Sequence, residues 1–179
     1  MALRGDRNYT DGTDISFFCN EVAEKGEVLV FSAVGSGAAM DDPTAVVTSP
    51  SADPSGEQVA GVLLNDVVSL DLTRQHINWH KDEVQLGGKV TLLRRGVIVT
   101  NMVESGNDPS NGDAAYFMAG GISATDVTTK GRVTTTQVSD LGTAAVHANS
   151  DIKAPEYRVG TFLSKKDSDG YAKVQVNLL

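Results

Sequence analysis

The chain has 179 residues, the size of one ordinary domain, and is long enough to bury a core without disulfides. Lys and Arg number 15 against 23 Asp and Glu, so the formal net charge is −8. Because phosphate binding needs clustered Lys and Arg, this balance argues against partners such as nucleic acid or an anionic membrane. The single cysteine, Cys19, excludes an internal disulfide. Since no secretory signal or membrane-length apolar run is visible, we expect a protein made and assembled in a cytoplasm.

Residues 1–24 differ in character from the rest of the chain. A polar, turn-rich stretch over 4–14 precedes an apolar group formed by Ile15, Phe17 and Phe18. We interpret 1–24 as an extended N-terminal arm that packs through its aromatic side chains, and 25–179 as the folded module. A short helix around 17–25 is the best helical candidate in this part of the chain.

The module reads as a series of short strands separated by turns. Runs rich in β-branched and aromatic residues end at Gly, Pro, Asn or Asp. A hairpin turn is predicted at Arg94-Arg95-Gly96, a surface loop over 106–113 and a second tight turn at Asp169-Gly170. A second short helix candidate covers 66–80. The expected strands cover 27–34, 44–48, 57–68, 89–93, 96–103, 114–118, 132–138, 157–163 and 171–179.

The last of these runs carries the clearest pattern. Ala172, Val174, Val176 and Leu178 share one face, while Lys173 and its alternating neighbours share the other. Alternation with a period of two is typical of a half-buried antiparallel strand. With no convincing helical periodicity over ten residues, the chain is predicted to be all-β, with a small barrel or sandwich and long loops.

Two histidines, His76 and His80, with Glu83 three residues further on, are the best candidate metal ligands. On a helix the two imidazoles would share a face. The zinc-protease pattern, however, needs Glu directly after the first His, where this chain has Ile77. Packing around Trp79 is the simpler interpretation, and no metal site is predicted.

Other catalytic patterns are incomplete. The stretch over 35–40 has two of the three glycines of a dinucleotide loop, and 167–170 places its glycine too early for a calcium loop. No nucleophile elbow is present, although Cys19 and the histidines, His147 included, could serve a catalytic site assembled in space. We therefore expect no catalytic residue, no cofactor and no enzymatic activity.

Several stretches resemble the capsid decoration (cement) proteins of tailed bacteriophages. The segment 71–81 is similar to decoration proteins of podovirus-like phages of aquatic bacteria. The resemblance rests on residues 26–54, 59–64, 71–81, 87–101, 112–117, 159–163 and 169–176.

The resemblance implies a non-enzymatic virion protein on the outer surface of an expanded icosahedral head. There it would stabilise the head by bridging neighbouring capsomers. The implied fold is a small β-barrel or β-tulip-like module. The implied partners are the major capsid protein and further copies of the chain, as a homotrimer or, alternatively, a dimer. Candidate contact residues are Tyr9, Ile15, Phe17, Phe18 and Trp79, since aromatic side chains dominate interface energetics.

Three alternatives stay open at the level of sequence. The aromatic residues of the arm could pack on the chain's own barrel instead of on a partner. The chain could be another virion module, such as a head fibre base, a tail component or an adhesion domain. A metal-dependent hydrolase built on His76, His80 and Glu83 is the remaining alternative.

Overall fold

A computed structural model describes residues 9–14, 17–32, 43–51, 57–66, 83–84, 86–118, 131–135 and 158–178, with the backbone alone for 9–11, 65–66 and 83. These residues are all-β, as predicted, and contain no helix. Their strands are β1 (Tyr9–Asp14), β2 (Phe18–Cys19), β3 (Ala23–Glu24), β4 (Val28–Phe31), β5 (Val46–Thr48), β6 (Val59–Asp66), β7 (Glu83–Val84), β8 (Val90–Thr100), β9 (Ala114–Phe117), β10 (Val133–Thr134), β11 (Arg158–Phe162) and β12 (Ala172–Asn177).

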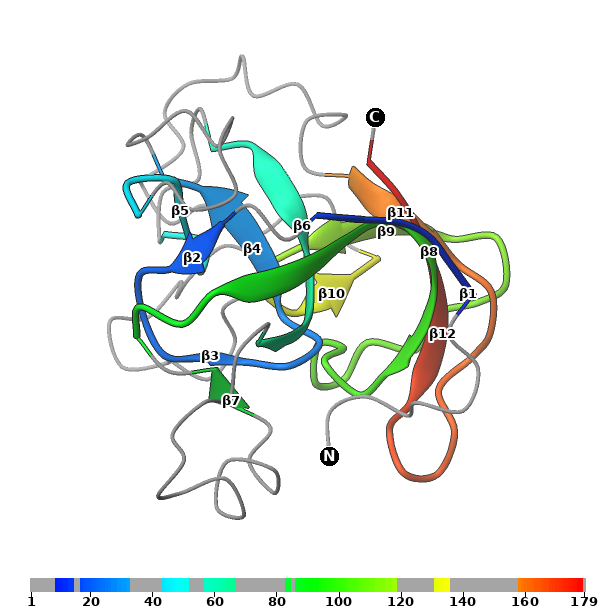
Figure 1. The fold of residues 1–179 in the computed structure, drawn as a ribbon. Helices are drawn as coiled ribbons and strands as arrows, with labels where there is room; N and C mark the ends of the chain where they lie inside the picture. Colours follow the sequence, from blue (N-terminus) through cyan, green and yellow to red (C-terminus); the bar gives the residue numbers. More distant parts are fainter. Residues whose placement is uncertain are drawn as a thin grey trace, which may run out of the picture.

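Ten of these strands form one mixed sheet in the order β10-β9-β11-β12-β8-β6-β4-β5-β2, with β1 also paired to β8. The pair β2–β5 is parallel, and the other ladders of the sheet are antiparallel. A short separate ladder joins β3 to β7. In Figure 1, β8 crosses from the side that holds β2, β4 and β5 to the side that holds β12.

The sheet curls so that β10 returns to β4. The amide of Val28 donates a hydrogen bond of 2.8 Å to the carbonyl of Gly131, just before β10. A parallel bridge between Val103 and Val133 joins β10 to the segment that follows β8. Strands β4, β6, β8, β12, β11, β9 and β10 therefore surround one apolar cluster, here called the first core. Its buried members are Val28, Val30, Val59, Val62, Leu93, Ile98, Val103, Ala115, Phe117, Val133, Val159, Phe162, Ala172, Val174 and Val176.

A second apolar cluster lies on the other face of β4, β6 and β8. Strand β2 covers this cluster. The Cys19 amide donates a hydrogen bond to the carbonyl of Gly88 at 2.9 Å, and the Cys19 carbonyl accepts one from the amide of Gly87 at 2.8 Å. Strand β2 thus lies between β5 and the start of β8. The second core consists of Cys19, Ala23, Leu29, Val47, Ala60, Leu63, Val84, Val90 and Leu92.

Strands β4 and β6 and the start of β8 (90–93) are largely buried on both faces because they separate the two cores. In β4, Val28 and Val30 belong to the first core and Leu29 to the second. In β6, Val62 and Leu63 divide in the same way. Burial on both faces explains why these segments read as continuous apolar runs and show no alternation.

The predicted hairpin turn at 94–96 is wrong, because β8 is one strand of 11 residues. In the pairing with β1, Gly12 lies opposite Arg95 and the next residue, Thr13, lies opposite Leu93. Arg94 of β8 therefore has no partner position in β1 and is an extra residue. A β-bulge of this kind shifts the alternation, and Leu93 and Ile98 consequently face the same core. The glycine signal in the sequence reflects this bend, where Gly96 has a φ of 150°.

Other local predictions have mixed outcomes. The alternation of β12 is confirmed, with Ala172, Val174 and Val176 buried. The turn ending at Gly170, whose φ is 85°, is also confirmed. The helix predicted over 17–25 is wrong: this segment holds β2 and β3, and its Cys19 and Ala23 side chains belong to the second core. The second helix candidate, 66–80, lies outside the described residues except for its first residue.

Candidate interaction surfaces

The N-terminal segment lies along β8 of its own chain. Tyr9 pairs with Val97 and Asp14 with Leu92, in antiparallel register. Leu92 also pairs with β6, and Val97 also pairs with β12. Because a strand has two edges, β6 and β12 share one edge of β8 and β1 occupies the other. The segment predicted as an arm therefore contributes a strand to the module in this structure.

The aromatic residues that follow β1 contact the module. Phe17 meets Phe31 edge to face, with ring centroids 5.2 Å apart, and Arg94 lies over the Phe31 ring at 5.9 Å. The ammonium of Lys89 lies over the Phe18 ring, 5.6 Å from the ring centroid. Both Phe17 and Phe18 remain partly exposed. These contacts match the alternative in which the aromatics pack on the chain's own sheet, and a role in a partner interface stays a prediction.

The other predicted site residues fall outside the described structure, or have only their backbone described. Ile15, Trp79, His76 and His80 lie outside the described residues, as does His147. Of Glu83 only the backbone is described, in β7 opposite Glu24. Across the described ranges, no group of three or more His, Cys, Asp or Glu side chains could hold a metal ion. No helix in the same ranges is long and apolar enough to cross a membrane.

Sequence reasoning missed a buried carboxylate, Glu27, at the place where the first core closes. Its side chain fills the space beside Gly131, where a Cβ would collide with the Glu27 Cγ and lie 2.8 Å from Oε1. The amide of Glu24 donates to Glu27 Oε2 at 3.1 Å, and the Ser49 side chain supplies a further hydrogen bond. Glu21 lies nearby and accepts from the amide of Ser49 at 2.6 Å.

Burial raises the pKa of Glu27 from 4.5 to about 7, because the apolar surroundings disfavour the ionised carboxylate. The hydrogen bonds from Ser49 and Glu24 act in the opposite direction, and the charges of Glu21 and Glu24 add to the rise. Burial likewise raises the pKa of the Cys19 thiol. The only sequence signal for Glu27 was its place at the head of an apolar strand.

A polar network fixes the loop between β8 and β9. Thr134 donates to Glu104 Oε2 at 2.6 Å, and Asn107 Nδ2 donates to Thr134 Oγ1 at 2.8 Å. Thr135 donates to Asn107 Oδ1 at 2.9 Å. Lys166 Nζ donates to the carbonyl of Glu104 at 3.3 Å and so ties this loop to the turn between β11 and β12. The loop predicted over 106–113 is thus held by specific contacts.

Comparison with solved structures gives a fold match. No family model matches the chain, and no curated protein matches it. A chain in the solved structure titled "The capsid of Myoviridae Phage XM1" superposes with a TM-score of 0.53 at 13% sequence identity. The match covers 99% of this chain and 88% of that one. At this identity the likeness concerns the fold, which this protein shares over nearly its whole length with a chain of a phage capsid.

Proposed function

We propose that this protein is a structural component of a tailed-phage virion. Specifically, we propose a non-enzymatic decoration protein that binds the outer surface of the expanded head and bridges neighbouring capsomers. The observation that carries the proposal is the full-length fold similarity to a chain of a phage capsid. The sequence resemblance to decoration proteins of podovirus-like phages supports the finer assignment.

The physical properties of the chain suit this role. A shell filled with DNA is stabilised by many identical contacts made at once, and a symmetric oligomer makes such contacts without one very tight site. A homotrimer is proposed, with a dimer as the alternative. The net charge of −8 favours solubility and disfavours binding to DNA. The protein would be assembled in the host cytoplasm and displayed on the outside of the virion.

Residues 1–24 and Trp79 are proposed to contribute to contacts with the major capsid protein. Phe17 and Phe18 are partly exposed while also packing on the module, so one face of each ring could meet a partner. Tyr9 and Ile15 precede these two phenylalanines in the sequence. An extended segment of this kind binds through main-chain hydrogen bonds as well as through side chains.

The test is to add purified protein to expanded shells that lack it. We expect saturable binding at a fixed ratio to the major capsid protein and a higher melting temperature of the shell. Unexpanded shells are the matched control and should bind less. Failure to bind expanded shells, with no change in their melting temperature, would contradict the proposal.

Another virion position, such as a head fibre base or a tail component, is the second candidate. The fold match is to a chain of a capsid structure and does not distinguish one virion position from another. Labelling the protein on intact particles separates the two, because a tail or fibre component would occur at few positions and a decoration protein at many.

A further inference from the structure

The outer face of the β8–β12–β11 ladder carries positive charge in an acidic protein. Its outward positions are set by pairing: Arg95 lies opposite Asn177, Val97 opposite Gln175 and Val99 opposite Lys173. Thr161 of β11 lies opposite Gln175 and extends the face. None of these outward positions is acidic.

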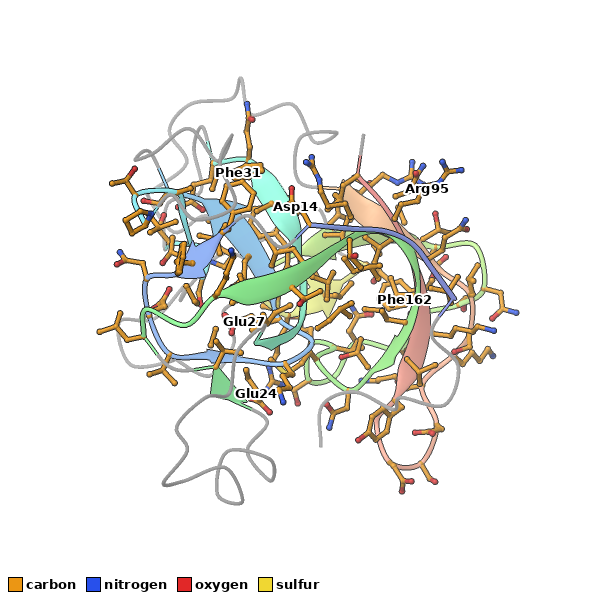
Figure 2. The ribbon with its side chains drawn as sticks, in the orientation of Figure 1. Asp14, Glu24, Glu27, Phe31, Arg95 and Phe162 are labelled. Carbon is orange, nitrogen blue, oxygen red and sulfur yellow. The ribbon has the colours of Figure 1, made fainter. Side chains whose placement is uncertain are left out.

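Two exposed arginines mark one end of this face. Arg95 is exposed on β8, and Arg158 is exposed at the first residue of β11. The Arg158 guanidinium is held toward the face, since Nε donates to the carbonyl of Gly160 at 3.1 Å and Nη2 donates to Thr161 Oγ1 at 3.1 Å. Figure 2 shows nitrogen-tipped side chains around Arg95 at this end. We call this the basic end.

The opposite end of the same strands is acidic. The loops over 104–113 and 164–171 meet there, joined by the bond from Lys166 to Glu104. They contain five carboxylates, Glu104, Asp108, Asp113, Asp167 and Asp169, against two lysines, Lys165 and Lys166. Figure 2 shows oxygen-tipped side chains on the turn between β11 and β12. We call this the acidic end. The six residues of β12 separate the two ends by about 20 Å.

We propose that the basic end of one copy binds the acidic end of a second copy, in a head-to-tail contact that deepens, and rests on, the homo-oligomer of the proposed function. The two ends carry charge of opposite sign and lie on one chain, so each copy offers both halves of a complementary contact. Because the halves differ, the contact is heterologous, and a heterologous contact closes into a ring when the rotation between copies allows it.

The arginines are suited to such a contact. Arg is enriched at protein interfaces, and its planar donor set matches carboxylates. The hydrogen bonds of Arg158 to its own strand hold its guanidinium in place before binding, which lowers the entropy lost on association. Asp108 and Asp169 are exposed at the acidic end and are the carboxylates chosen for exchange. Asp167 is left unchanged, because its carboxylate accepts from the amides of Asp169 and Tyr171.

Sedimentation velocity of the isolated protein tests the contact without any shell. Between roughly 50 and 500 mM NaCl the Debye length falls from about 14 to about 4 Å, so association should weaken by about tenfold or more. Arg95→Glu with Arg158→Glu should abolish association, and so should Asp108→Lys with Asp169→Lys. An equimolar mixture of the two variants should restore association in alternating order, in species with even numbers of copies, since each variant then offers the other a complementary end.

The mixture is the matched control for folding, because variants that had unfolded could not rescue each other. Arg95→Gln, which removes one exposed charge, should give an intermediate weakening. A wild type that stays monomeric at low salt overturns the contact. So does association that survives both double variants, or a mixture that fails to assemble although both variants are folded by circular dichroism. Shell binding is measured separately, so either idea can fail while the other stands.

Discussion

The buried carboxyl of Glu27 makes a sharp prediction about stability and pH. Replacing it by Gln keeps the side-chain shape and an oxygen that can accept the bond from the Glu24 amide. It removes the charge that must otherwise form in an apolar site. The effect should therefore depend on pH, whereas a simple packing change would not.

The sign follows from proton binding. Because the pKa of Glu27 is about 7 in the folded protein and 4.5 for an ordinary glutamate, the folded state binds the proton more tightly. The stabilisation is complete below pH 4.5 and is lost as the pH rises through about 7. At about 1.4 kcal/mol per pKa unit, the loss from this one group approaches roughly 3 kcal/mol.

Urea unfolding at pH 5 and pH 8 measures this directly. At pH 5 the wild type and Glu27→Gln should differ by less than about 1 kcal/mol in free energy of unfolding. At pH 8 the variant should be more stable by roughly 2–3 kcal/mol. Asp108→Asn, an exposed carboxyl, is the control and should show no such gap. An equal difference between Glu27→Gln and wild type at both pH values would refute the reasoning.

Three further predictions concern the cores. Gly160→Ala should lower the free energy of unfolding in urea by about 3 kcal/mol or more, because the added Cβ would collide with a carbonyl of the paired strand β12. The control Gly87→Ala has open space around it and should cost only about 1–2 kcal/mol, because residue 87 has a left-handed backbone conformation. Phe162→Ala removes a fully buried ring and should cost about 3–5 kcal/mol; its neighbour Leu163 is 37% exposed, and if Leu163→Ala costs as much, the assignment of the first core is wrong. The thiol of Cys19 is buried with a raised pKa and should react with a disulfide reagent only at the rate of unfolding, so rapid labelling of the native protein would contradict its place in the second core.

The fold class was predictable from the sequence, but the way the sheet encloses two cores was not. Alternation revealed β12 because only one of its faces is buried. Strands β4 and β6 lack alternation because both faces are buried, and one sequence does not say against what. At 94–96 the same glycine signal serves a turn or a bulge. Strands β1 and β12, which are distant in the sequence, pair with β8 on both sides of the bend, and this pairing determines that the segment forms a bulge.

The candidate contact residues were less predictable than the strands. Aromatic content drew attention to Phe17 and Phe18, whose rings the structure places against Phe31 and under Lys89. The charged face and the buried Glu27 escaped notice because their character depends on neighbours from other strands. Arg95 and Arg158 are 63 positions apart in the sequence and share a face only through β12.

The most direct test of the central claim is a cryo-EM map of the intact virion that carries this protein. We expect density for the two-core module on the outer surface of the expanded head, repeated at equivalent positions and in contact with more than one capsomer. Density for the module only in the tail or only inside the shell would contradict it, as would its absence from the particle.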